Sequence, residues 1–171
     1  TLTLKARGKG GHSSRPVADN AVIRLSKAVT ALHENPFEPE LVSPVTDMLE
    51  VLGEEAGGVK GFMMRNLWLS EPLLLSSMSQ DPVSDSMVRT TTAVTMFNAG
   101  IKENVISQQA EAKVNFRLLP GFTPEQLVET VSEIIDDANI EIVSDDWKPG
   151  PPVAAMDGLG YGRVEAAITS I

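Results

Sequence analysis

The chain has 171 residues, contains no cysteine and carries a net charge of −9. The lack of cysteine excludes disulfides and thiolate metal sites, and the acidic balance argues against a nucleic-acid partner or an anionic membrane. No run of 18 apolar residues occurs, so no transmembrane helix is expected. A hydrophobic content of 42% fits a globular chain with one domain, or one domain with an appendage.

The first predicted strand covers residues 1–7, where apolar and polar side chains alternate. A glycine-rich loop, residues 8–16, follows it, and His12 stands at the apex of this loop. Its three glycines allow tight turns with exposed N–H groups. Asp19 or Asn20 can then cap a helix that ends before Pro36. The apolar stripe of this helix consists of Val22, Leu25, Val29 and Leu32.

Residues 36–88 are rich in proline, serine, methionine and leucine. This composition predicts a helical insertion that covers one side of the domain or contacts a neighbouring chain. Within it, residues 43–52 form a predicted helix, and the apolar segment 62–75 is broken at Pro72.

Two further strands are predicted at residues 89–98 and 110–117, the second from a regular apolar–polar alternation. A helix begins at Thr123, which is followed by proline at the first helical position and by glutamine two residues later. Residues 140–143 form a short final strand, and 160–171 form a terminal helix after a segment rich in proline and glycine.

Without the insertion, the elements follow the order strand, helix, strand, strand, helix, strand. This order predicts an α+β fold of ferredoxin-like type: a two-layer sandwich with a four-stranded antiparallel sheet and two helices on one face. One edge strand would be free to pair with a second copy. The same fold also suits a non-catalytic oligomerisation or small-ligand-binding module, which remains the alternative.

The residues of this chain do not suggest a metal site of their own. It has two histidines, no cysteine and no close spacing of metal ligands. Ser13 and Ser14 follow His12 directly, so a serine hydrolase is a further candidate. Adjacent residues rarely form a nucleophile–base pair, however, and no carboxylate can be assigned to orient the imidazole.

Three segments together resemble a known family. Residues 10–16, GGHSSRP, resemble a signature of M20-type metallopeptidases, and residues 98–106 with 114–121 resemble a second signature. Their order and separation are similar to those of the dimerisation, or lid, domain of that family. Residues 66–68 and 89–92 resemble the carboxypeptidase S-like branch, which includes hydrolases of N-acyl amino acids.

The resemblance implies that residues 1–146 form a dimerisation domain, with 36–88 inserted in it. Residues 147–171 would lead back to a separate catalytic domain that this chain lacks. That domain would hold two zinc ions and a glutamate base, with no cofactor in this fragment. The expected assembly is a homodimer acting on a small peptide or an N-acyl amino acid. The isolated fragment is expected to be inactive.

Three residues match functional positions of the family. The resemblance implies that His12 stabilises the oxyanion in the active site of the partner copy, and that Asn104 and Arg117 bind the carboxylate of the substrate. Ser107 departs from the family, which usually has proline there. The two residues expected to form the turns that place these side chains are Gly100 and Gly121.

Overall fold

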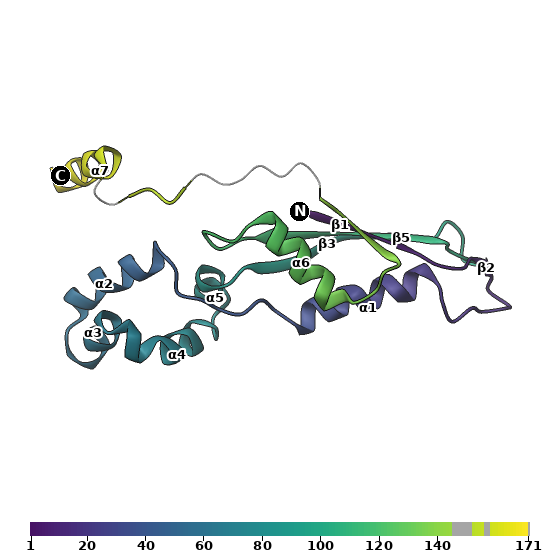
Figure 1. The fold of residues 1–171 in the computed structure, drawn as a ribbon, viewed down its shortest axis with the longest axis horizontal. Coiled ribbons are helices and arrows are strands. Elements are labelled where there is room, and N and C mark those ends of the chain that lie inside the picture. Colours follow the sequence, from purple (N-terminus) through teal and green to yellow (C-terminus); the bar gives the residue numbers. More distant parts are fainter. Residues whose placement is uncertain (145–151, 156–157, 171) are drawn as a thin grey trace.

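The computed structural model describes residues 1–144, 152–155 and 158–170. Its main sheet has the order β3-β5-β1-β6, and every neighbouring pair is antiparallel. Helices α1 and α6 pack against one face of this sheet (Figure 1). The predicted ferredoxin-like sandwich is therefore confirmed. The bounds of these elements are β1 Leu2–Arg7, α1 Ala21–Glu34, β3 Thr91–Ala99, β5 Gln109–Arg117, α6 Pro124–Ile135 and β6 Ile140–Ser144.

The remaining elements lie at the two ends of the sheet and beyond β6. A two-stranded ribbon extends one end, and four helices follow α1 at the other end (Figure 1). The helix after β6 has no buried residue. Most of the predicted proline- and glycine-rich segment before it lies outside the described residues. These elements are β2 Gly11–His12, β4 Val105–Ile106, α2 Val45–Ala56, α3 Gly58–Arg65, α4 Leu67–Met78, α5 Pro82–Val88 and α7 Leu159–Thr169.

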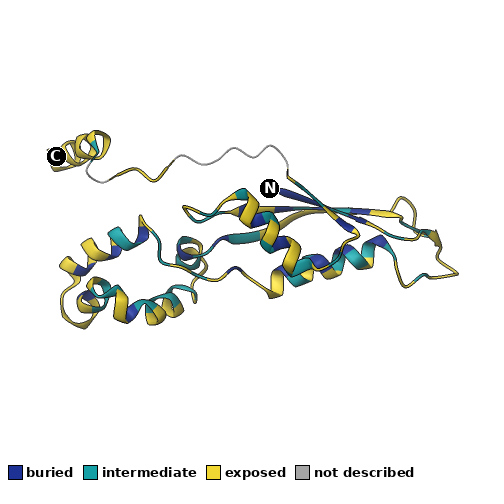
Figure 2. Cartoon of the chain, viewed as in Figure 1, coloured by how far each residue is buried: buried dark blue, intermediate teal, exposed yellow. Residues whose placement is uncertain are grey.

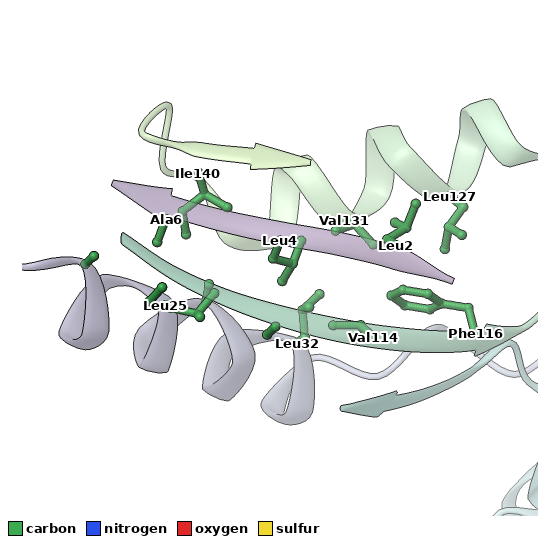
Figure 3. Close-up of a cluster of buried hydrophobic side chains, with 14 of the residues drawn as sticks. Leu2, Leu4, Ala6, Leu25, Leu32, Val114, Phe116, Leu127, Val131 and Ile140 are labelled. Carbon is green, nitrogen blue, oxygen red and sulfur yellow. The ribbon is translucent and has the colours of Figure 1, made fainter. Parts of the chain in front are cut away.

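The core lies between the sheet and the two helices, and the alternation of β1 and β5 produces it (Figures 2 and 3). Leu4 on β1 and Val114 on β5 are fully buried and point towards the helices, whereas Lys5 and Lys113 lie on the other face. The helices contribute Leu25, Leu32, Leu127 and Val131 to this core. At about 25 cal/mol per Å², burying such apolar side chains is the main force that closes the sandwich.

Local signals fix where both helices begin. Asn20 caps α1 by accepting a hydrogen bond from the Ile23 amide at 3.0 Å. Thr123 and Gln126 form a reciprocal capping box at the start of α6, with bonds of 2.8 and 3.2 Å. Of the two predicted caps of α1 the structure uses Asn20 and not Asp19, and the predicted Thr123 caps α6.

The helices of the insertion do not cover the sheet. They extend from its end and form a second, smaller core around Val45, Leu49 and Val88 (Figure 1). Because a Cβ on Gly61 would lie 2.5 Å from the carbonyl oxygen of Gly53, these glycines allow α2 and α3 to pack closely. The expectation that the insertion covers one side of the domain is wrong, because its helices pack mainly on one another.

Pro72 does not break the apolar segment. It lies inside α4, which continues from Leu67 to Met78. Proline removes one helical hydrogen bond and leaves the carbonyl of Trp68 without its usual donor. Pro72 and Trp68 both lie on the exposed side of α4, where water can replace that donor. The predicted break is therefore wrong.

Arg89 joins the insertion to the sandwich. Its guanidinium binds the Asp85 carboxylate at 2.9 Å, the Ser79 hydroxyl at 3.2 Å and the backbone carbonyl of Phe37. Phe37 in turn packs edge-on against Phe116 of β5, with the ring centroids 6.0 Å apart. None of the helices in the described part of the chain is long and apolar enough to cross a membrane.

Candidate functional site

The β2–β4 ribbon places two of the three predicted site residues side by side. His12 pairs with Val105 and Gly11 pairs with Ile106, so the glycine-rich loop and the Asn104 loop form one small sheet. The amide of Ser13 donates to the carbonyl of Asn104 at 3.1 Å. The sequence did not predict this pairing, since strands of two residues have no alternating pattern.

The His12 ring has a defined hydrogen-bond partner on one side only. The Ser14 amide donates to Nδ1 at 3.2 Å, and the Ser14 hydroxyl lies 2.9 Å from the same atom. Because a backbone N–H can only donate, Nδ1 acts as the acceptor, and a neutral ring then carries its proton on Nε2. Nε2 has no hydrogen-bond partner among the described residues, so its N–H is available to an oxygen outside this chain.

The contact between Ser14 and His12 also bears on the serine-hydrolase alternative. Contrary to expectation, the structure does bring this nearby hydroxyl within hydrogen-bond distance of the ring. No carboxylate is hydrogen-bonded to His12 in the part of the chain that the structure describes, so a triad is incomplete. Ser14 is better described as the residue that orients the imidazole. From the sequence, Ser14 was expected only as a candidate nucleophile.

Only one of the three loop glycines is required by close packing against backbone. A Cβ on Gly8 would lie 2.4 Å from the backbone nitrogen of Ala21. At Gly10 the nearest atoms belong to the flexible Gln108 side chain, and at Gly11 no atom lies within 4 Å. Gly8 therefore allows the loop to start directly against the N-terminus of α1.

Asn104 has an unsatisfied polar atom. Its Oδ1 is buried and has no hydrogen-bond partner among the described residues. A buried acceptor of this kind costs about 1–3 kcal/mol unless a partner is supplied. Two features shape the loop beside it: Gly100 has a positive φ of 78°, and the Ser107 hydroxyl donates to the Gln109 carbonyl at 2.6 Å. Ser107 therefore orders a position where the family usually has proline.

Arg117 lies far from the other two predicted site residues, His12 and Asn104. It ends β5, opposite Thr91, whereas His12 lies beyond the start of that strand. Eight residue steps from Gln109 to Arg117 correspond to roughly 26 Å. Arg117 is exposed and takes part in none of the ion pairs between described residues, and Gly121, four residues later, has a φ of 88°. The chain does not bring Arg117 to the same place as His12.

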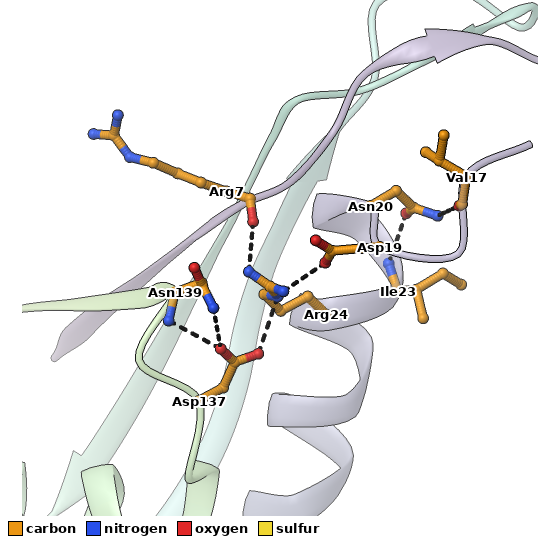
Figure 4. A network of polar contacts seen from close by, with 8 residues as sticks. All are labelled: Arg7, Val17, Asp19, Asn20, Ile23, Arg24, Asp137 and Asn139. Carbon is orange, nitrogen blue, oxygen red and sulfur yellow. Dashed lines mark hydrogen bonds and ion pairs between the residues drawn. The ribbon is translucent and has the colours of Figure 1, made fainter.

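A second polar cluster borders the His12 loop, and no sequence pattern predicts it. Arg24, in the first turn of α1, contacts Arg7, Asp19 and Asp137 (Figure 4). None of these residues belongs to a recognised signature, and their distance along the chain conceals the cluster. As for metals, no group of three or more possible ligands occurs among the described residues.

The chain matches known sequences along most of its length. The model of a family described as "Peptidase dimerisation domain" matches residues 1–143. The chain is 38% identical over 161 residues to "Probable carboxypeptidase S-like 2" of Dictyostelium discoideum, covering 93% of this chain and 31% of that protein. It is 36% identical over 173 residues to the N-fatty-acyl-amino acid synthase/hydrolase PM20D1 of Bos taurus, covering 99% and 34%.

Solved structures agree on the fold. An M20 family metallo-carboxypeptidase from Sulfolobus solfataricus superposes with a TM-score of 0.54 at 17% identity, over 98% of this chain and 48% of that chain. Human carnosine dipeptidase 1 superposes with a TM-score of 0.51 at 13% identity, over 99% of this chain and 40% of that chain. The chain spans about a third of the length of the curated relatives named above. It belongs to the M20-type peptidase dimerisation domain family, and its relatives include both carboxypeptidase S-like proteins and N-fatty-acyl-amino acid hydrolases.

Proposed function

We propose that this chain is the lid of a zinc-dependent carboxypeptidase or N-acyl-amino-acid amidohydrolase. The lid domain would span residues 1–146 with an insertion at 36–88, and residues 147–171 would lead to the catalytic domain. The observation that carries the proposal is the β2–β4 ribbon. It holds His12 beside the Asn104 loop and leaves Nε2 without a partner among the described residues.

In this role the N–H at Nε2 of His12 donates a hydrogen bond to the oxyanion that forms when the substrate amide is attacked. The ring is oriented by Ser14 before the substrate binds. One preorganised donor of this kind contributes about 2.7–4 kcal/mol to transition-state stabilisation, or 10²–10³ in kcat. Amide hydrolysis places its negative charge on one oxygen, which suits such a donor.

In this proposal the zinc ions are held by the separate catalytic domain, as the family resemblance implies. Zinc in such an enzyme polarises the scissile carbonyl and activates water. The residues of this chain then have two tasks, which are to bind the substrate and to stabilise charge.

Arg117 and Asn104 would bind the free carboxylate of the substrate. Arg117 is exposed at the end of β5, and a guanidinium can bind a carboxylate through two parallel hydrogen bonds. The Asn104 amide can donate through Nδ2. Its buried Oδ1 lacks a partner within the described chain, which fits a site that another group completes.

The separation of His12 from Arg117 supports a homodimer with shared sites. Roughly 26 Å of strand separates these ends of the sheet, too far for both side chains of one copy to contact one small substrate. A two-fold dimer would instead combine His12 and Asn104 of one copy with Arg117 of the other. Each dimer would then hold two such sites.

The edge of the sheet offers a surface for this pairing. Among the described residues, no strand pairs with the outer edge of β3, and Val94 and Phe97 are 43% and 41% exposed on its helix side. A hollow of about 390 Å³ beside Val94 is lined by Val29, Thr30 and His33 of α1 and by Thr92 and Val94 of β3. An exposed strand edge next to a groove of mixed polar and apolar lining suits pairing with a second copy.

The direct test is His12→Ala in the full-length enzyme. We expect kcat to fall by about 10²–10³ with KM nearly unchanged, because the donor acts mainly in the transition state. Lys9→Ala, an exposed position in the same loop, is the control and should retain kcat. An increase in KM at constant kcat would contradict the oxyanion role.

A second test uses the 171-residue chain alone. With zinc and N-acyl amino acids it should show no turnover, because the catalytic domain is absent. Clear turnover would favour a site contained in this chain. Labelling of Ser14 by a fluorophosphonate would then identify the serine-hydrolase alternative.

A further inference from the structure

The guanidinium of Arg24 binds both ends of the loop that carries His12, which here means the whole connection between β1 and the cap of α1 from residue 8 to residue 19. Its Nη1 donates to the backbone carbonyl of Arg7 at 2.9 Å, and its Nη2 donates to the carboxylate of Asp19 (Figure 4). Arg7 is the last residue before the loop, and Asp19 lies just before the cap of α1. One side chain therefore connects the point where the loop leaves β1 with the point where it enters α1.

Arg24 is itself fixed by a third partner. Its Nε lies 3.0 Å from Oδ2 of Asp137, in the turn between α6 and β6. Asp137 accepts hydrogen bonds from the amide and the side chain of Asn139, at 2.9 and 3.1 Å. The Arg24 side chain is 16% exposed, whereas those of Asp19 and Asp137 are 53% and 29% exposed, so the guanidinium is the most shielded member of this cluster.

The backbone contacts nearby reinforce the same closure. The Lys9 amide donates to the Asp19 carbonyl at 3.0 Å, and Gly8 lies directly against the backbone of Asn20 and Ala21. Between these closing contacts, no residue from 9 to 19 is fully buried. Since the loop has almost no packing of its own, its position depends on such polar contacts and on the β2–β4 ribbon.

We propose that Arg24 is a positioning residue for His12. It does not touch the substrate, but it holds the two ends of the loop at the spacing that aims the imidazole. This inference rests on the proposed role of His12. Arginine suits the task because its planar group presents several donors in fixed directions, whereas lysine would present one flexible ammonium. A loop displaced by about 1 Å can cost a catalytic group 10²-fold in rate.

The test is a double-mutant cycle in the full-length enzyme. We expect Arg24→Gln to lower kcat by about 10- to 100-fold with KM nearly unchanged. In the His12→Ala background the same substitution should lower kcat by less than about threefold, because its effect passes through the missing ring. An equal loss in both backgrounds would overturn the inference.

Arg89→Gln is a matched control. Arg89 is 15% exposed, binds one aspartate at 2.9 Å and one backbone carbonyl, and lies at the other end of the sheet. The Arg89→Gln substitution should lower the melting temperature without causing the loss of kcat that depends on His12. A loss equal to that of Arg24→Gln, and equally dependent on His12, would show that general stability is responsible. If Arg24→Gln does not fold, Asp19→Asn at an exposed carboxylate replaces it in the cycle.

Hydrogen–deuterium exchange separates this inference from the proposed function. We expect Arg24→Gln to increase exchange in peptides covering residues 8–19, and Arg89→Gln to leave them unchanged. Increased exchange in an enzyme whose kcat is insensitive to His12→Ala would support the positioning of the loop and contradict the oxyanion role. Unchanged exchange in Arg24→Gln would contradict the positioning itself.

Discussion

Nε of Arg24 lies 3.0 Å from Oδ2 of Asp137 and joins the start of α1 to the turn before β6. The pKa of Asp137 lies below its usual value, mainly because the Asn139 amide donates to the carboxylate. The Asn139 side chain and the positive charges of Arg24 and Lys27 also lower this pKa, whereas partial desolvation of the carboxyl raises it. The charged form of Asp137 therefore stabilises the fold.

This relationship predicts a pH-dependent loss of stability in Asp137→Asn. A carboxyl whose pKa is lowered by folding contributes its stability above the unfolded pKa of about 3.9, and loses it as the pH falls through the folded pKa. Because water screens this partly exposed carboxylate, we expect the variant to lose less than about 1 kcal/mol of unfolding free energy at pH 7. The difference should shrink below about pH 4. Urea titrations of both chains at pH 3 and pH 7 measure it, and a difference that grows on acidification would contradict the assignment.

The close approach of Gly8 to α1 gives a prediction about the loop. In Gly8→Ala, the new Cβ would lie 2.4 Å from the Ala21 nitrogen, so the backbone must move. We expect a loss of about 1–3 kcal/mol of unfolding free energy. Gly11→Ala is the control and should stay within about 0.5 kcal/mol, because no atom lies near its Cβ. Equal losses in a denaturant titration would show that close packing at Gly8 is not the reason for glycine there.

The proposed dimer surface can be tested on one strand. Val94→Lys places a charge on the helix side of β3, next to the groove of α1. We expect it to shift the full-length enzyme from dimer to monomer, because an unpaired charge in an apolar interface costs several kcal/mol. Met96→Lys is the control: Met96 is 50% exposed and pairs with Lys113 on the other face of the sheet. Sedimentation velocity compares the two, and a monomer produced only by Met96→Lys would place the interface on the opposite face.

Much of the sandwich could be predicted because its signals are local. The alternation in β1 and β5, the Asn20 cap and the Thr123 capping box each occupy a few consecutive residues. The strands and helix starts that these signals predict therefore occur in the structure. The buried face of α1 differs from the predicted stripe: Ala21 and Ala28 are buried with Leu25 and Leu32, whereas Val22 and Val29 are only partly buried.

The features that were missed depend on contacts between distant segments. The β2–β4 ribbon and the cluster around Arg24 join residues that no local pattern connects. The continuation of α4 through Pro72 likewise depends on exposure of that side of the helix, which the sequence does not reveal. The candidate residues His12, Asn104 and Arg117 came from motifs. Their division between opposite ends of the sheet follows only from the topology.

That division gives the most direct test of the proposed shared active site. His12→Ala and Arg117→Ala full-length enzymes, each of which we expect to have little activity alone, are mixed under conditions that allow subunit exchange. In a mixed dimer one site would combine intact His12 of one copy with intact Arg117 of the other. Activity should therefore recover to roughly a quarter of the wild type, since half of the dimers are mixed and each has one complete site.

The matched control mixes His12→Ala with Asn104→Ala. These residues lie on the same ribbon, so no mixed site would contain both, and no recovery is expected. Recovery with Arg117→Ala but not with Asn104→Ala is the result that we predict. If mixing His12→Ala with Arg117→Ala gives no activity above that of the separate variants, one substrate is not bound by residues from two copies.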